Sequence, residues 1–182
     1  IIGTPSGISL APEGGAHQSI GTPLIGISQP GLLSFEPAFA DELSAIMNYG
    51  FNYLQDENGG SIYLRLSTRS IDQPVRNLDQ NLTNHIVKGG YWLKKPGPNP
   101  EIIIVYQGVM ANEVIQATAN LGENFKDLGV LSITSSDNLF HEWKKKNISL
   151  SEEASKSHIE YLLENIPKDT KIITVIDGHP MT

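Results

Sequence analysis

Alternating apolar segments in the second half of the chain constrain its fold more than any other feature. Residues 101–106 (EIIIVY) form a continuous apolar run, typical of a strand buried on both faces. Residues 111–125 carry apolar side chains at helical spacing, and residues 130–134 (VLSIT) are predicted as the next strand. A helix capped by Ser151 follows, and then a third buried strand over residues 171–176. This order predicts an α/β fold with a parallel sheet and right-handed crossovers.

The first third of the chain is punctuated too often for regular structure. Residues 1–33 contain 7 glycines and 4 prolines, which predicts a long loop with short strands, one of them at residues 7–10. Pro37 is favoured at the first position of a helix, and we expect that helix to run to about residue 55. The residues at 61–68 suit a pleated surface and are predicted as a strand.

The polar segment 71–84 has no hydrophobic period and is predicted to connect two domains. The part of the chain after this connector opens with a strand at 88–93. The last predicted strand has no helix after it to cover its apolar residues. At roughly 150 residues per domain, a chain of this length is one domain with a remainder or two incomplete ones, and we expect the second.

Composition excludes several classes of function. The chain has 13 Lys and Arg against 20 Asp and Glu, a net charge of −7, so a nucleic-acid interface is not expected. It has no cysteine, which excludes disulfides, thiolate metal sites and a cysteine nucleophile. No apolar run approaches the ~18 residues that span a bilayer, so no membrane association is predicted and the cytoplasm is the expected compartment.

Most polar clusters in the sequence carry little functional signal. The chain lacks the short motifs of common nucleotide-binding, metallopeptidase and hydrolase sites. Asp137, His141 and Glu142 lie close together in sequence, but no second pair of ligands supports a metal site, so none is predicted. His85 and His158 are interpreted as ordinary surface histidines.

Two places offer side chains to a ligand. His179 follows the last predicted strand, and ligands gather at the carboxyl ends of strands in open α/β sheets. Residues 13–18 (EGGAHQ) present a carboxylate, an imidazole and an amide in a loop whose glycines let the backbone approach a ligand. The residues alone leave two alternatives for this loop, a functional site or a turn whose polar side chains bond their own backbone.

The loop resembles a known pattern. Residues 13–18 are similar to the Asp-Gly-Pro-Thr-His-Gln loop of transketolases and to the Asp-Gly-x-x-His region of the homodimeric pyruvate dehydrogenase decarboxylating component, with Glu13 in place of the aspartate. Residues 33–43 (LSFEPAFADEL) resemble the Tyr-Asp-Pro-Ala-Tyr-Ala-Tyr-Glu stretch of that pyruvate dehydrogenase component. Residues 88–91 and 101–109 resemble the opening of the family's carboxyl-terminal domain. The chain thus resembles the thiamine diphosphate-dependent transketolase and 2-oxoacid dehydrogenase superfamily, most closely the pyruvate dehydrogenase type.

The resemblance implies a fold and an activity. Residues 1–80 would be the end of a pyrimidine-binding parallel-sheet domain, and residues 81–182 the start of a transketolase-type carboxyl-terminal α/β domain. The whole enzyme would decarboxylate a 2-oxoacid, pyruvate above all, and transfer an acetyl unit to a lipoyl acyltransferase partner. A homodimer is implied as well. The alternatives are transketolase-type glycolaldehyde transfer and a non-catalytic α/β interaction module.

The resemblance also implies roles for individual residues. His17 would be catalytic, through a hydrogen bond to the substrate oxygen that develops charge, while Glu13 and Gln18 would bind the substrate or hold the imidazole. Arg69 lies one position away from the arginine that meets sugar phosphate in transketolases and is interpreted as a surface charge. Thiamine diphosphate and Mg²⁺ are the implied cofactors, and the residues that bind them are expected upstream of this chain, so the chain alone should be inactive.

Overall fold

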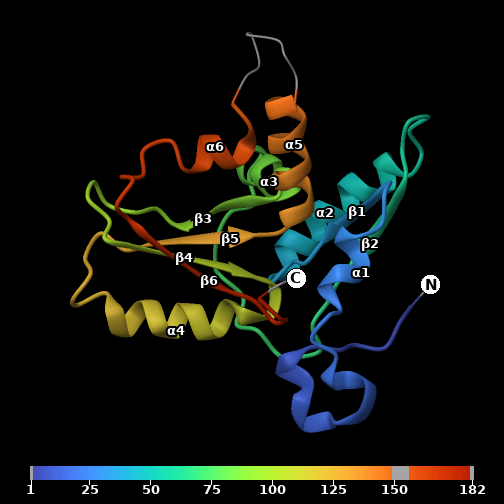
Figure 1. The fold of residues 1–182 in the computed structure, drawn as a ribbon, viewed down its shortest axis with the longest axis horizontal. Coiled ribbons are helices and arrows are strands. Elements are labelled where there is room, and N and C mark those ends of the chain that lie inside the picture. Colours follow the sequence, from blue (N-terminus) through green and yellow to red (C-terminus); the bar gives the residue numbers. More distant parts are fainter. Residues whose placement is uncertain (1, 149–155, 181–182) are drawn as a thin grey trace.

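A computed structural model of the chain, which describes residues 2–148 and 156–180, contains two separate β-sheets (Figure 1). The first sheet pairs β1 (Leu32–Phe35) with β2 (Ser61–Leu64) in parallel, with Leu32 opposite Ser61 and Phe35 opposite Leu64. Helix α2 (Ala40–Tyr53) connects the two strands. The first half of the chain therefore contributes one β-α-β unit.

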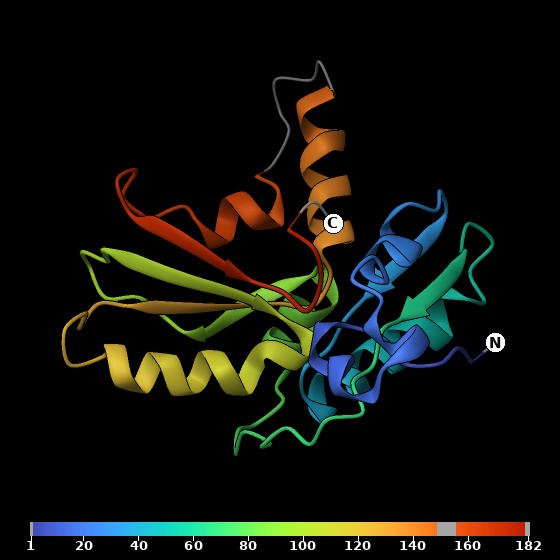
Figure 2. The same cartoon turned by 60° about the horizontal axis from the view of Figure 1, so that its bottom comes forward.

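The second sheet has the strand order β3-β5-β4-β6. Strands β4 (Ile102–Gln107), β5 (Gly129–Ile133) and β6 (Lys171–Val175) run parallel, while β3 (Gly90–Lys94) is antiparallel to β5. Helix α4 (Ala111–Leu121) lies on one face of this sheet, and α6 (His158–Leu162) lies on the other (Figure 2). The predicted α/β class with parallel strands is confirmed.

The remaining elements are helices, placed before and between the strands in the chain. The first 30 residues form two 3₁₀-helices, η1 (Ile8–Glu13) and η2 (Gly15–Gln18), and the short helix α1 (Pro23–Ile27). Helix α3 (Gln80–Lys88) precedes β3, η3 (Gly108–Met110) precedes α4, and α5 (Ser136–Ile148) follows β5. None of the described helices is long and apolar enough to cross a membrane.

Several local predictions were wrong. The strand predicted at residues 7–10 is largely part of η1, where Pro12 and the following glycines favour tight turns over an extended backbone. Pro37 lies outside α2, which begins after Phe39. The segment predicted as an irregular connector contains the first turns of α3, which begins where the Asp79 carboxylate accepts a hydrogen bond from Leu82 N (2.7 Å).

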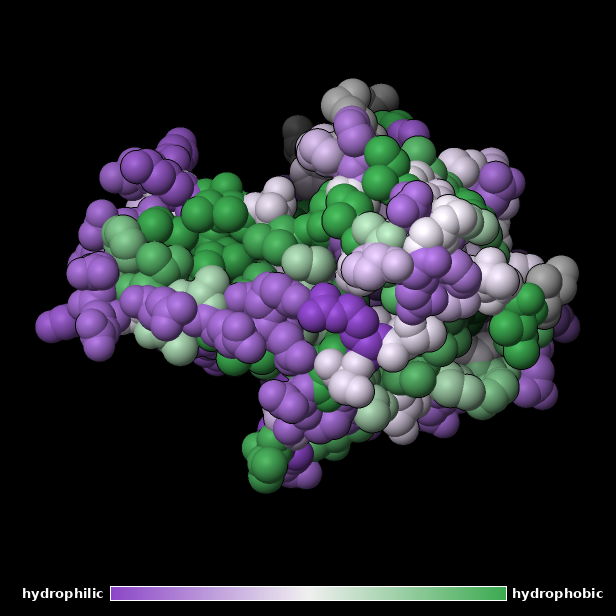
Figure 3. Space-filling view, turned by 90° about the horizontal axis from the view of Figure 1, so that it is seen from below, coloured by the Kyte–Doolittle hydropathy of each residue, from purple (hydrophilic) through white to green (hydrophobic). Residues whose placement is uncertain are grey.

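The last helix and strand also differ from the predictions. The predicted cap Ser151 lies outside the described residues, and α6 begins after Ser157, which forms a capping box with Glu160. Strand β6 has the sequence of a buried strand but forms the sheet edge, and Ile172 and Ile173 are about half exposed, as expected for a strand with no helix after it to cover it. Viewed from below, the half of the molecule that holds the second sheet carries an apolar area (Figure 3).

Apolar packing forms three clusters. One lies between α4 and strands β4 and β5, one joins β1, α2, α3 and Tyr91, and one lies between β5, α5 and α6. Phe39, from the start of α2, packs into the first of these clusters, so the first half of the chain contributes to the core of the second sheet. The two sheets therefore share a hydrophobic core.

A buried carboxylate also joins the two halves. Glu42, in the first turn of α2, is fully buried and accepts hydrogen bonds from the backbone N–H groups of Ala38 (2.6 Å) and Phe39 (3.0 Å). Its other oxygen accepts hydrogen bonds from Tyr91 Oη on β3 (2.5 Å) and Ser132 Oγ on β5 (3.3 Å). Burial raises the pKa of Glu42, and these hydrogen bonds oppose that rise.

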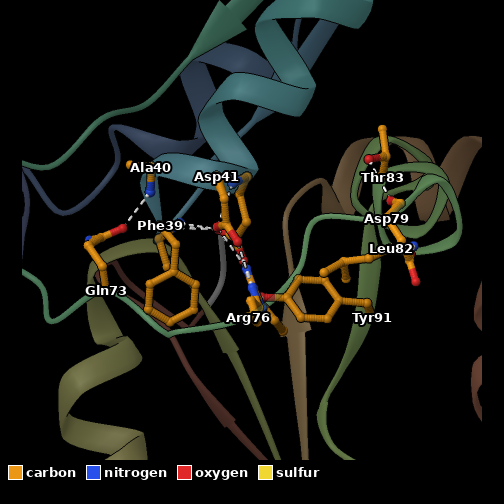
Figure 4. Close-up of polar contacts among 12 residues, drawn as sticks. Phe39, Ala40, Asp41, Gln73, Arg76, Asp79, Leu82, Thr83 and Tyr91 are labelled. Carbon is orange, nitrogen blue, oxygen red and sulfur yellow. Dashed lines mark hydrogen bonds and ion pairs between the residues drawn. The ribbon is translucent and has the colours of Figure 1, made fainter.

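Arg76 closes this network from the connector. Its guanidinium donates two hydrogen bonds to the Asp41 carboxylate (2.6 and 2.8 Å) and one to Tyr91 Oη (2.7 Å), and it lies over the rings of Phe39 and Tyr91 (Figure 4). A planar guanidinium suits both a bidentate carboxylate and aromatic faces. The connector is thereby held against α2 and β3.

Tyr91→Phe should destabilise the chain because it removes the hydroxyl that donates to the buried Glu42 carboxylate. Hydrogen bonds to charged groups contribute about 1.5–3 kcal/mol, and we expect a loss of that size in the free energy of unfolding, measured with urea. Tyr161→Phe, at a more exposed tyrosine, is the matched control and should change stability by less than about 0.5 kcal/mol. Equal effects of the two substitutions would contradict the role given to Tyr91.

Candidate functional site

The carboxyl ends of strands from both sheets meet at one place. Glu36 follows β1, Arg65 follows β2, Gln107 ends β4, and Asp177 lies two residues after β6. These four residues line a pocket of about 40 Å³ between the sheets. In open α/β folds this edge of a sheet is where ligands bind.

Arg65 lies between two carboxylates in this pocket. Its guanidinium donates to Glu36 Oε1 (2.5 Å), to Asp177 Oδ2 (2.9 Å) and to the Asp177 carbonyl (2.9 Å). Glu36, Arg65 and Asp177 are 7%, 8% and 4% exposed. We call these three residues the ion cluster.

Backbone hydrogen bonds and two glycines position the ion cluster. Glu36 N donates to Thr134 O at the end of β5 (2.8 Å), which ties β1 to the second sheet. Gly108 has a φ of 57°, and a Cβ there would overlap the Glu36 carboxylate. A Cβ on Gly7 would likewise overlap the Asp177 carboxylate. Both approaches require glycine, so the local sequence is adapted to the cluster.

The cluster carries two acidic groups and one basic group, which makes full ionisation costly in a buried place. Burial raises the pKa of Glu36 to about 7; the Arg65 charge opposes this rise and the Asp177 charge adds to it. Glu36 therefore changes its protonation near neutral pH. Such a group in a pocket is a candidate for function.

The three residues predicted from the sequence, Glu13, His17 and Gln18, lie in one loop formed by η1 and η2. His17 Nδ1 faces the Pro5 carbonyl oxygen (2.7 Å), and Gln18 Nε2 donates to Ala11 O (3.0 Å). The Glu13 carboxylate is about half exposed and lies 4.0 Å from His17 Nδ1. The structure places the three side chains within η1 and η2, and each contacts its own loop.

Hydrogen bonds fasten this loop to the end of β6. Ser9 N and Ser9 Oγ donate to the two oxygens of the Asp177 carboxylate (2.6 and 2.9 Å). His179 N donates to Ile20 O (3.0 Å), so the segment that follows β6 contacts the loop at a second point. His179, the other sequence candidate, thus contributes a backbone contact to the loop.

The remaining candidates lie elsewhere. His141 pairs with Asp137 (Nδ1 to Oδ1, 3.1 Å), while the Glu142 carboxylate accepts a hydrogen bond from His158 N (2.7 Å). Among residues 2–148 and 156–180, no group of three or more His, Cys, Asp or Glu side chains is placed to hold a metal ion. Arg69 forms an exposed ion pair with Glu113, in agreement with a surface charge.

His158 was predicted to be a surface histidine, and this was wrong. It is 4% exposed, its Nε2 faces the Gly90 carbonyl (2.8 Å), and its ring lies 5.1 Å from that of His85. Burial lowers the pKa of both histidines. The polar residues around position 158 suggested an exposed side chain. Its burial could not be predicted, because it depends on the packing of α6 against α3 and α5.

Sequence reasoning missed the ion cluster as a unit. Glu36 was interpreted only as part of a helix start, and Arg65 as a member of a strand. One signal in the sequence could have marked Arg65, since it is the only charged residue in the predicted strand of residues 61–68. Its two partners lie 29 and 112 residues away in sequence, so no local pattern could have assigned them.

Comparisons with known proteins agree with the resemblance read from the loop. Transketolase 2 of Escherichia coli (strain K12) is 28% identical over 139 residues, and the pyruvate dehydrogenase E1 component of Buchnera aphidicola subsp. Baizongia pistaciae is 29% identical over 136 residues. These matches cover 74% and 73% of this chain. No family model matches the chain.

Solved structures show the same fold. A transketolase variant from Pichia stipitis superposes with a TM-score of 0.67 at 22% sequence identity, over 95% of this chain. The chain has a transketolase-type fold. It spans 22% of that transketolase chain, 19% of Transketolase 2 and 15% of the pyruvate dehydrogenase component.

Glu36→Gln should remove one pH-dependent contribution to stability. The folded-state pKa of Glu36, about 7, exceeds the value of 4.5 for an unperturbed glutamate, so folding retains a proton that the unfolded chain releases. This contribution is fully present below pH 4.5 and is lost as the pH rises through 7. At about 1.4 kcal/mol per pKa unit, the free energy of unfolding of the unsubstituted chain should fall by roughly 3 kcal/mol over this range from Glu36 alone.

Denaturant unfolding between pH 4.5 and 8 measures this effect. The Glu36→Gln chain should lack that part of the decline, whereas Glu113→Gln, in the exposed pair with Arg69, should keep it. The same decline in all three chains would show that Glu36 does not hold the proton.

Proposed function

We propose that this chain is part of a thiamine diphosphate-dependent enzyme that decarboxylates a 2-oxoacid, with pyruvate as the preferred substrate. The sequence similarity to a pyruvate dehydrogenase E1 component supports this, together with the similarity of residues 33–43 to that component. Because the chain spans less than a quarter of its relatives, the proposal concerns the whole protein to which these residues contribute.

The orientation of His17 is the observation that carries the proposal. Its Nδ1 faces the Pro5 carbonyl, which can only accept a hydrogen bond, so Nδ1 holds a proton and donates it. This leaves Nε2 as the atom that meets a substrate, as an acceptor in the neutral ring and as a donor in the imidazolium. A donor fixed in this way suits an oxygen that develops negative charge in the transition state.

Glu13 and Gln18 are proposed to support the same step. The Glu13 carboxylate lies 4.0 Å from His17 Nδ1, on the side of the ring that faces the Pro5 carbonyl. The amide of Gln18 uses its N–H to bond Ala11 O, which leaves its carbonyl oxygen to meet a substrate hydroxyl or N–H group. Both side chains would orient the substrate at His17.

We assign the described residues to the binding of the substrate and not to the binding of the cofactor or the metal ion. The residues that bind thiamine diphosphate and Mg²⁺ are proposed to belong mainly to other regions of the whole protein. When bound, thiamine diphosphate supplies the carbanion chemistry, which no side chain provides. This chain would bind, orient and polarise the substrate.

Transketolase-type transfer of a glycolaldehyde unit is the second candidate. The similarity to Transketolase 2 and the transketolase-type fold favour it. The exposed pair of Arg69 with Glu113 offers little support for binding a sugar phosphate, because Arg69 is already neutralised. A non-catalytic interaction module remains the outcome if no cofactor binds.

The proposed compartment, oligomeric state, partner and domains of the whole enzyme follow from its assignment to the pyruvate dehydrogenase type. The enzyme would be a cytoplasmic homodimer that passes its acetyl unit to a lipoyl acyltransferase partner. In this setting the residues 1–80 and 81–182 would belong to the pyrimidine-binding and carboxyl-terminal domains.

His17→Ala in the full-length protein should lower turnover of the preferred substrate by ~10²-fold or more, since it removes a transition-state hydrogen bond or a proton donor. Steady-state kinetics measure this effect. His141→Ala, at an exposed histidine on α5, is the matched control and should leave turnover unchanged. Near-normal turnover of the His17→Ala protein would exclude the role proposed for His17.

A calorimetric titration of the full-length protein with thiamine diphosphate and Mg²⁺ tests the class of function. Saturable binding is expected, and no heat of binding would favour the non-catalytic module. Turnover assays with pyruvate and with a ketose phosphate then separate the two enzymes. Higher kcat/KM with the ketose phosphate would replace the pyruvate proposal with the transketolase one.

A further inference from the structure

A short segment, residues 5–9, separates the ion cluster from His17 and is bonded to both. On the cluster side, Arg65 Nη2 donates to the Ser6 carbonyl oxygen (3.0 Å). Ser9 donates to both oxygens of the Asp177 carboxylate, through its backbone N–H (2.6 Å) and its hydroxyl (2.9 Å). Three hydrogen bonds to buried charged groups therefore hold this side of the segment.

The other side of the segment holds His17. The Pro5 carbonyl faces Nδ1 of the imidazole (2.7 Å), and Gly7 N donates to the His17 carbonyl oxygen (3.0 Å). The ring and the backbone of His17 are thus bonded to Pro5 and Gly7, the two residues that flank Ser6. The position of the imidazole depends on the position of this segment.

Apolar packing does little to hold the loop. Leu10 is buried, but residues 11–20 are mostly exposed, and among these η2 has no buried residue. Few buried contacts leave a segment free to open locally at low cost in free energy. The polar contacts of residues 5–9 are therefore the main restraint on the loop.

We propose that Arg65, Asp177 and Ser9 are positioning residues, which fix the His17 imidazole through residues 5–9 without touching the substrate. This inference rests on the proposed function of His17. Because Asp177 follows β6 and Arg65 follows β2, the active loop is set by both sheets at once. A small displacement of a catalytic group by a distant change can cost up to ~10²-fold in rate.

The geometry predicts which kinetic constant changes when one of the positioning residues is substituted. A displaced His17 weakens an interaction made in the transition state, so kcat should fall while KM changes little. A residue that merely stabilised the fold would lower the melting temperature and leave kcat of the folded enzyme intact. Local amide exchange of residues 7–18 reports the position of the loop without any reference to activity.

Ser9→Ala in the full-length protein is the decisive variant, because it removes one hydroxyl and leaves no buried charge unpaired. We expect amide exchange of residues 7–18 to be about tenfold faster, and kcat to fall about tenfold at unchanged KM. Ser9→Thr, which keeps a hydroxyl, should restore most of both. Ser28→Ala, at an exposed serine that follows α1, is the matched control and should change neither quantity.

Arg65→Met tests the same chain of contacts from its other end. It should reduce the exchange protection of residues 7–18 and kcat by more than Ser9→Ala does. Arg69→Met, at the exposed pair with Glu113, should change neither quantity. If the Arg65→Met protein does not fold, the Ser9 variants decide alone. Unchanged exchange of residues 7–18 in Ser9→Ala, or equal effects of Ser9→Ala and Ser28→Ala, would overturn the proposal.

The two proposals fail in different ways. If His17→Ala retains full turnover while Ser9→Ala loosens the loop, then the function proposed for His17 is wrong, and the restraint on the loop stands without a catalytic role. If His17→Ala loses turnover while Ser9→Ala leaves exchange and kcat unchanged, then the restraint is wrong and the role of His17 stands.

Discussion

The buried guanidinium of Arg65 connects the ends of strands from both sheets to the loop that carries His17. It follows β2 of the first sheet, donates to Glu36 after β1, to Asp177 after β6 of the second sheet, and to the Ser6 carbonyl in the loop that carries His17. An arginine is suited to this place because its planar group offers five donors in fixed directions. Burying one positive and two negative groups costs desolvation energy, so the cluster adds little net stability. We infer that it specifies how the strand ends and the loop meet.

Glu42 and Arg76 form a second polar junction, between the start of α2 and strands β3 and β5. Glu42 is fully buried, yet both of its oxygens have donors, from the start of its own helix and from β3 and β5. A carboxylate that is satisfied in this way is tolerated in a core, whereas an unpaired one is not. Both junctions tie the first half of the chain to the second sheet.

Strands β4 and β5 and helix α4 could be predicted because their signals are local, whereas α5 (Ser136–Ile148) was not predicted. Residues 101–106 are apolar along their whole length, and helix α4 has the expected spacing. The edge position of β6 could not be predicted in this way. Its sequence resembles that of a buried strand, and the order of strands places it at the edge of the second sheet. The same applies to His158, whose neighbours in sequence are mostly polar and which is buried by contacts with residues far away in the chain, among them His85 and Gly90.

For the site, the sequence by itself determined which side chains the loop offers. Residues 13–18 and their resemblance to transketolases and pyruvate dehydrogenases predict Glu13, His17 and Gln18 as site residues, since a loop motif is a local property. Only the tertiary structure decided what holds that loop. Arg65 and Asp177 are 112 residues apart, and Asp177 and Ser9 are 168 apart. Hydrogen bonds over such separations exist only after two sheets have brought the carboxyl ends of their strands together.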